Sequence, residues 1–440
     1  MKLNLGSNFR KLFIISLIWL LLEGIFRKWF FYSFAGPIFY IKYILFGLTY
    51  FLYFLNYFSL PPVRKIYQYF ILIFVLICFF GLLNNKLNNP IIVGLIGVTV
   101  HLLFIPVIHL NQFLFINLKS INVFSKILAY ISIPICILGM IQFYLPVDHI
   151  LNGFTNDDQL ISRVGGFTRI SSIFSFVKIY NAYLLFSVTF LGVVLLNKLL
   201  NSERILIYVL SIVLLIINMF MTGSRLPLML MGFNFIIIGI YAFISFNTLR
   251  KTVFVTFLFG FISIIFLYMT TSLVKDPIDA TIWRFEKAES RHRTESTGYT
   301  DIQLRMEDRL DIFKFSNEAS WFGYGIGMTY QGAKSLIKNP IPFYFEEEGE
   351  RLVLELGVIG GTIVLLMRLM FFIFAFGFLK NCKSVEIKLF LLALTLLITP
   401  PLLTMQMTTF SYLENFFYYF SFGLIIALYK IYSNEDTVSK

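Results

Sequence analysis

The chain has 440 residues, of which 58% are hydrophobic and only 14% are charged. A soluble domain carries roughly 25% charged residues, so too few polar side chains remain here to cover the surface of a soluble fold. The formal net charge is +12, but no basic extramembrane domain is present to hold nucleic acid. We expect Lys and Arg to mark cytoplasmic loops instead.

The hydrophobic residues form twelve blocks, most of them close to the ~20 residues needed to cross a ~30 Å hydrocarbon core. The predicted fold class is therefore all-α, a polytopic integral membrane protein with about twelve transmembrane helices. In chain order the predicted spans are residues 12–30, 36–58, 66–83, 91–110, 126–145, 179–197, 205–221, 226–246, 252–270, 352–379, 387–410 and 413–431.

Basic residues are unevenly distributed between the segments that connect these spans. With the N-terminus inside, the inner segments carry sixteen Lys and Arg residues and the short outer loops carry four. Because an excess of Lys and Arg marks the cytoplasmic side, both termini are predicted to be cytoplasmic. The four outer basic residues are Arg27, Lys28, Lys86 and Arg225.

Two outer segments are long, at about residues 146–178 and 271–350. The second holds fourteen of the 24 acidic residues, but long loops cross the membrane largely regardless of their charge. The predicted organisation is nine spans over residues 1–270, a large periplasmic loop with an amphipathic helix over 271–350, and three spans with a short cytoplasmic tail over 351–440.

The first of these outer segments contains Arg-Val-Gly-Gly-Phe-Thr-Arg at residues 163–169. Paired glycines let the backbone approach a ligand closely, and they also mark ordinary turns. Arg163 and Arg169 are therefore candidate substrate-binding residues, with a plain turn as the alternative.

A second motif, Thr-Gly-Ser-Arg-Leu-Pro at residues 222–227, lies between two hydrophobic blocks at the outer face. Ser224 is a candidate N-cap of the next span, whose N-terminus favours a phosphate. Arg225 adds a permanent charge and a forked set of donors that matches phosphate oxygens. These residues predict a catalytic role for Arg225 and a substrate-binding role for Ser224. The alternative is an arginine that snorkels to the membrane interface.

Residues 300–319 have the hydrophobic periodicity of an amphipathic helix. Arg309 projects into the apolar stripe of this helix and Arg305 flanks it. A helix on the membrane surface would aim Arg309 toward the membrane, which makes Arg309 a catalytic candidate and Arg305 a substrate-binding candidate. The alternative is that Arg309 pairs with a carboxylate of its own loop.

An acidic run, Glu-Glu-Glu-Gly-Glu-Arg at residues 346–351, comes just before a predicted span. A carboxylate here can act as a general base toward a sugar hydroxyl. Glu347 and Glu348 are the catalytic candidates and Glu350 a substrate-binding candidate, while a solvated charge run is the alternative.

The cysteines and histidines show no spacing typical of metal ligands, and the chain lacks nucleotide-binding motifs. The sequence therefore predicts no metal and no cofactor. Of the four histidines, His149 and His292 are the two placed to reach an outer site. Cys78, Cys136 and Cys382 are interpreted as packing residues.

The order of these pieces resembles the O-antigen polymerase and O-antigen ligase superfamily. The resemblance covers most of the chain and is carried by loose motifs that keep the same order and the same sides of the membrane. Among them are a Gly-Ser-Arg turn and an arginine that precedes Gly-Tyr-Gly-Ile-Gly. The motifs lie at residues 22–29, 166–175, 221–225, 309–327 and 355–360.

This resemblance implies a GT-C-like, metal-independent glycosyltransferase at the periplasmic face of a bacterial inner membrane. Its substrate would be an undecaprenyl-pyrophosphate-linked oligosaccharide. Membrane lipids and a chain-length regulator are the other partners it suggests, and nucleic acid is not among them. Arg225 would hold the pyrophosphate and Arg309 would assist.

The sequence departs from the superfamily at one point. Ligases of this kind often show a His-Asn pair shortly before the Glu-x-Gly opening of a span, whereas residues 345–350 contain no histidine. That difference favours a polymerase of O-antigen or exopolysaccharide units. The alternatives are a ligase-type transferase that moves the glycan to lipid A core or protein, and a transporter without enzymatic activity.

Overall fold

The structure is a computed structural model that describes most of the chain. The described residues are 5–56, 66–153, 163–245, 266–294, 313–345, 348–403 and 411–438, with the single residues 250, 262 and 311.

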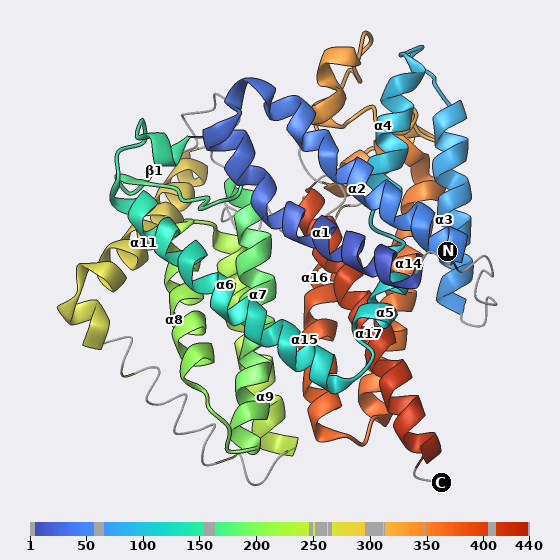
Figure 1. The fold of residues 1–440 in the computed structure, drawn as a ribbon. Helices are drawn as coiled ribbons and strands as arrows, with labels where there is room; N and C mark the ends of the chain where they lie inside the picture. The colour runs from blue at the N-terminus through green and yellow to red at the C-terminus, as the bar shows by residue number, and fades with distance from the viewer. Residues whose placement is uncertain are drawn as a thin grey trace.

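Helices account for nearly all regular structure in these residues (Figure 1). The α-helices are α1 (Leu5–Ile25), α2 (Ala35–Asn56), α3 (Ile66–Leu83), α4 (Ile91–Leu102), α5 (Val107–Leu114), α6 (Leu118–Tyr144), α7 (Val177–Leu200), α8 (Leu206–Met221), α9 (Arg225–Ser245), α11 (Ser272–Thr294), α13 (Ser316–Ala319), α14 (Glu348–Asn381), α15 (Val385–Ile398), α16 (Pro400–Leu403) and α17 (Tyr412–Val438). Shorter elements are the π-helix η1 (Phe26–Phe30), the 3-10 helices η2 (Tyr32–Phe34), η3 (Ile150–Asn152) and η6 (Gln331–Leu336), and the strands β1 (Arg163–Val164) and β2 (Phe167–Thr168).

Within the described residues, eight helices are long and apolar enough to cross a membrane. The pair α4 and α5 is bent by 40° and makes a ninth if it forms one broken span. The chain therefore has the helices of an all-α, multi-pass membrane protein. The predicted spans that coincide with the eight helices are 36–58, 66–83, 126–145, 179–197, 226–246, 352–379, 387–410 and 413–431.

Four predicted spans have a different outcome. The span at 91–110 falls on the bent pair α4 and α5. The span at 205–221 is α8, whose 16 residues are shorter than the other candidates. The span at 12–30 corresponds to α1 and η1, and α1 is not among the eight. Most of the span at 252–270 lies outside the described residues.

Helix α7 is the centre of the bundle and is buried along most of its length. It packs against α8, α9, α15 and α17. Aromatic contacts fix it there, such as the stacked rings of Phe186 and Phe417 with centroids 4.3 Å apart. Because four helices pack against α7, the polar side chains in its first turns are fixed relative to those neighbours.

Helix α14 bends sharply near its N-terminal end. Gly357 has φ 72°, a backbone conformation open to glycine, and a Cβ there would lie 2.2 Å from the carbonyl oxygen of Trp321. The loop before α14 docks at this bend, where the Tyr324 N–H donates to the Leu354 carbonyl (2.7 Å) and the Val358 N–H to the Ser320 carbonyl (3.2 Å). The bend therefore joins the loop before α14 to a helix long and apolar enough to cross a membrane.

Helices α1 and α2 form a hairpin that carries buried charge. The Glu23 carboxylate accepts hydrogen bonds from Arg27 (3.0 Å) and Lys42 (3.1 Å), and the Lys42 ammonium lies 3.0 Å from the centroid of the Phe39 ring. Lys28, in the π-helix between them, donates to the Ser171 hydroxyl at 3.0 Å. The hairpin is thus tied to the segment that leads into α7.

The segment 271–350 differs from the predicted outer loop. Its first part is the 23-residue helix α11, which packs against α8 and β1 and was not predicted. The amphipathic helix expected over residues 300–319 lies partly outside the described residues. In its described part, residues 313–315 form a turn and only the four-residue α13 follows.

Figure 1 shows the hairpin β1–β2 and the loop that precedes α14 near one end of the bundle. The connection between α7 and α8 and the C-terminus lie at the other end. The hairpin and this loop, which belong to the two segments predicted to be external, therefore lie near the same end of the bundle.

Candidate functional site

The turn between α8 and α9 is built from Thr222, Gly223 and Ser224. Gly223 has φ 61°, so the chain reverses in the left-handed region that glycine adopts without strain. The Thr222 hydroxyl donates to the Met219 carbonyl (2.8 Å) and closes the end of α8. Helix α9 then begins at Arg225, so Ser224 and Arg225 stand where the sequence predicts the start of a span.

Arg169 reaches this turn from the strand hairpin. Its Nε donates to the Thr222 carbonyl and its Nη2 to the Ser224 hydroxyl, each at 3.0 Å. The side chain is 9% exposed. The hairpin itself is held by Phe167, whose ring stacks on Phe143 at 4.6 Å. Two predicted site motifs far apart in sequence are thus in direct contact.

Two further helices converge on the same turn. Asn181 of α7 donates to the Ser224 hydroxyl (2.8 Å), and Arg284 of α11 donates to the Gly223 carbonyl. The guanidinium of Arg225 lies 5.6 Å from the ring centroid of Phe285, which also belongs to α11. Three arginines from three parts of the chain therefore surround one turn.

The electrostatics of this turn favour an anion. Burial, and then the positive charge of Arg284, lower the pKa of Arg169 to about 9, so its guanidinium stays protonated at neutral pH. The first turn of α9 adds the partial positive charge of a helix N-terminus. Arginine forks match phosphate oxygens, so the arrangement suits a phosphate or pyrophosphate group.

A group of acidic and basic residues lies at the start of α7. Lys178 pairs with Glu414 of α17 at 3.5 Å, and Glu348 of α14 lies within electrostatic range of Lys178. Lys178 and Asn181 are three residues apart on α7, which places them on one face of the helix. The first turn of α7 therefore connects the arginine-rich turn with this carboxylate group.

The remaining predicted site residues have different positions. Arg163 is exposed at the start of the hairpin, where it pairs in register with Thr168. Glu350 is buried and pairs with Lys314 at 3.1 Å, and Glu348 is also buried. Arg305, Arg309 and Glu347 lie outside the described residues.

Two members of the site, Arg284 and Asn181, were missed in the sequence. The signal for Arg284 was present in the spacing of Ile278, Ile282 and Phe285, which repeats at i, i+4 and i+7 and predicts a helix. No sequence signal distinguishes Asn181 from the other polar residues of its span. Its role is visible only in the packing of α7 against the turn.

Another buried polar pair was not predicted. His101 of α4 and Glu355 of α14 meet at 2.9 Å, and both side chains are fully buried. The second Glu355 oxygen accepts from the Thr329 backbone N–H (2.8 Å) and hydroxyl (2.7 Å). Of the two histidines expected to reach an outer site, His149 accepts from the Leu151 N–H and caps η3, and the side chain of His292 lies outside the described part.

A scan of the chain against protein-family models finds no match, and a search of curated proteins finds none either. The fold and the site together define an all-α protein with the helices of a multi-pass membrane protein. An arginine-rich turn lies at one end of its bundle.

Proposed function

We propose that this protein is a glycan polymerase of the O-antigen or exopolysaccharide type. It joins repeat units carried on undecaprenyl pyrophosphate at the outer face of a bacterial inner membrane. The observation that carries this proposal is the convergence of Arg169, Arg225 and Arg284 on the turn that opens α9. An arginine-rich helix N-terminus suits the pyrophosphate of such a donor.

In the proposed reaction, a hydroxyl of the acceptor glycan attacks the anomeric carbon of the donor's first sugar. A new glycosidic bond forms, and the bond from that carbon to the pyrophosphate oxygen breaks with the electron pair leaving on the oxygen. Arg169, Arg225 and Arg284 stabilise the negative charge that develops there. Such fixed charges contribute most in a site from which water is excluded.

The attacking hydroxyl also has to lose a proton. Of the two acids predicted to be catalytic, Glu348 lies within the described residues, where it is buried in the first turn of α14 and within electrostatic range of Lys178 at the start of α7. We assign proton acceptance to Glu348 in this proposal. A carboxylate positioned near the attacking oxygen contributes typically about 10²–10⁴-fold to such a step.

The finer architecture belongs to the same proposal. The chain would have about twelve spans and a GT-C-like arrangement, with both termini in the cytoplasm. The arginine-rich turn, the hairpin and the loop before α14 would then face the periplasm, where the lipid-linked repeat units are joined. A chain-length regulator would be a further partner.

The test uses purified protein with a synthetic polyprenyl-pyrophosphate repeat unit, and the products are separated by mass. Wild type is expected to make ladders of lengthening glycan, and Arg225→Ala is expected to make none. Arg204→Ala is the matched control, because Arg204 is exposed at the opposite end of α8. Ladders from Arg225→Ala equal to those of wild type would remove the turn from the reaction.

The rival functions give different products in the same assay. A ligase-type transferase would leave the lipid-linked glycan at its original length and move it to added lipid A core or protein. A transporter would give no product with either acceptor. In proteoliposomes it would move the intact lipid-linked unit across the bilayer.

A further inference from the structure

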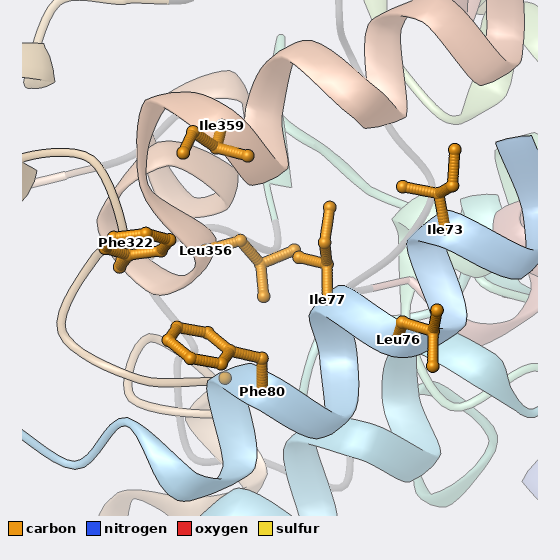
Figure 2. A pocket seen from close by; sticks show the side chains of 8 residues that line it. Ile73, Leu76, Ile77, Phe80, Phe322, Leu356 and Ile359 are labelled. Atoms are coloured by element: carbon orange, nitrogen blue, oxygen red, sulfur yellow. The ribbon is translucent and has the colours of Figure 1, made fainter.

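A cavity of about 330 Å³ opens on the side of the bundle between α3 and α14 (Figure 2). Both helices are candidate membrane spans. All of its lining residues are apolar: Ile73, Leu76, Ile77, Phe80, Gly81, Phe322, Leu356 and Ile359. We call this cavity the α3–α14 groove. It lies on the opposite side of the bundle from α8 and α11 in Figure 1, away from the arginine-rich turn.

The groove faces the surroundings of the bundle. Leu76 is 59% exposed, and Ile73, Phe80, Phe322 and Ile359 are exposed as well. From Ile73 to Phe80 the groove follows α3 for about two turns, or about 10 Å. In a spanning helix these side chains contact the hydrocarbon region of the membrane.

One end of the groove carries a positive charge. Beyond Phe80, α3 ends at Leu83, and Lys86 follows in the short connection to α4. Its ammonium donates to the Ser320 hydroxyl at 2.6 Å and lies 5.8 Å from the ring centroid of Tyr324. Ser320 is two residues before Phe322, which lines the groove, so the charge lies close to its mouth.

We propose that the α3–α14 groove binds one hydrocarbon chain of an anionic membrane lipid whose phosphate contacts Lys86. The volume of about 330 Å³ is smaller than one turn of a helix with its side chains, which is about 10–12 Å wide and about 5.4 Å high, so a transmembrane helix does not fit inside the groove. A flexible chain fills a narrow apolar groove without this limit. The cation at the mouth then favours a lipid whose headgroup bears net negative charge.

The bound chain would lie against the joint between the outer loop and α14. Leu356 and Ile359 lie on either side of the bend at Gly357, and Phe322 comes from the loop that docks there. The rings of Phe80 and Phe322 are 5.0 Å apart, and Asn84 donates to the Phe322 carbonyl at 2.7 Å. A lipid in the groove therefore stabilises the docked loop, whether or not the protein is a polymerase.

Native mass spectrometry of the purified full chain tests this proposal with two lipids that share their chains, dioleoyl phosphatidylglycerol and dioleoyl phosphatidylcholine. Wild type is expected to retain one phosphatidylglycerol and to bind it about fivefold more tightly than phosphatidylcholine, the effect of roughly one basic residue at a lipid headgroup. Soluble glycerol phosphate is expected not to displace it. Equal retention of the two lipids, or displacement by glycerol phosphate, would overturn the proposal.

Two variants separate the headgroup contact from the groove. Lys86→Ala is expected to remove the preference for phosphatidylglycerol, while Lys338→Ala, an exposed lysine of the docked loop, is expected to keep it. Ile359→Trp fills the groove from its exposed rim and is expected to weaken binding of both lipids. An unchanged preference in Lys86→Ala contradicts the assignment. The assignment is also contradicted if the purified protein is a dimer and Ile359→Trp makes it a monomer, because the groove would then be an interface between two copies.

Discussion

Buried basic side chains have two different surroundings in the described part of this molecule. In the α1–α2 hairpin and at the α4–α14 contact, Lys42 and His101 bond to the carboxylates of Glu23 and Glu355. At the α8–α9 turn, Arg169 donates instead to a backbone carbonyl and a hydroxyl, and the neighbouring charge that acts on its pKa is that of Arg284.

The difference indicates two roles for buried charge. A basic side chain bonded to a buried carboxylate holds two helices in register. Three arginines that converge on one turn bring like charges together, and a region of one sign attracts ligands of the other. The first kind of cluster therefore supports the fold, and the second is suited to bind an anion.

The largest expected effect concerns stability at the α4–α14 contact. Glu355→Ala leaves His101 and Thr329 without their buried acceptor, and breaking such a buried pair costs about 3–5 kcal/mol. Denaturant unfolding in detergent micelles measures the loss. The control is Glu203→Ala, whose half-exposed pair with Lys198 contributes about 0–1 kcal/mol. Equal losses of stability in Glu355→Ala and Glu203→Ala would mean that the buried pair does not support the fold more than an exposed one.

A comparable effect is expected on activity at the arginine-rich turn. Arg169→Ala removes two hydrogen bonds to the turn and one charge, and losing one such stabilising group lowers kcat by about 10²–10³-fold. Arg169→Lys is expected to recover only part of this, because an ammonium lacks the planar fork. Initial rates of glycan extension measure both. If Arg169→Ala lost stability as Glu355→Ala does and kept its rate, the two clusters would have the same role.

A smaller effect is expected at the bend of α14. Gly357→Ala forces a side chain into a left-handed conformation and against the Trp321 carbonyl, which costs about 1–3 kcal/mol. Hydrogen exchange over residues 320–327 is expected to speed up as the docked loop loosens. Gly377→Ala is the control on the same helix, since a Cβ there meets nothing within 4 Å. Unchanged exchange in Gly357→Ala would mean that the bend does not hold the loop.

The smallest effect is expected from Ser224→Ala. The substitution removes the hydroxyl that accepts from both Arg169 and Asn181, and one hydrogen bond contributes about 0.5–1.5 kcal/mol. We expect a loss of roughly tenfold or less in kcat with little change in KM, because the arginine is misplaced while the charge remains. A loss as large as that of Arg169→Ala would give Ser224 a direct part in the reaction.

Length and hydrophobicity predicted eight segments that the structure describes as helices long and apolar enough to cross a membrane. Arg169, Ser224 and Arg225 were singled out because they lie in turns at the ends of hydrophobic blocks, and the structure brings them to one turn. Helix α11 was missed because its charged residues obscured a short apolar repeat. In the described part of the amphipathic helix expected over residues 300–319, residues 313–315 form a turn and Phe315 packs against Phe343, a contact that the local pattern does not specify.

Pairings between distant segments could not be predicted. His101 and Glu355 are 254 residues apart, and their contact depends on how α4 and α14 pack. The same holds for Arg284, which reaches the Gly223 carbonyl from a helix 61 residues further along the chain. Hydrophobic periodicity specifies which face of a helix is buried, but it does not specify the partner of a polar residue on that face.

The central claim is that the α8–α9 turn binds the pyrophosphate of a lipid-linked glycan. The most direct measurement compares the affinity of the purified protein for a polyprenyl pyrophosphate and for the corresponding polyprenyl alcohol. Wild type and Arg204→Ala are expected to prefer the pyrophosphate strongly, and Arg225→Ala is expected to lose most of that preference while still binding the alcohol. An equal preference for the pyrophosphate in Arg225→Ala and wild type would contradict the account.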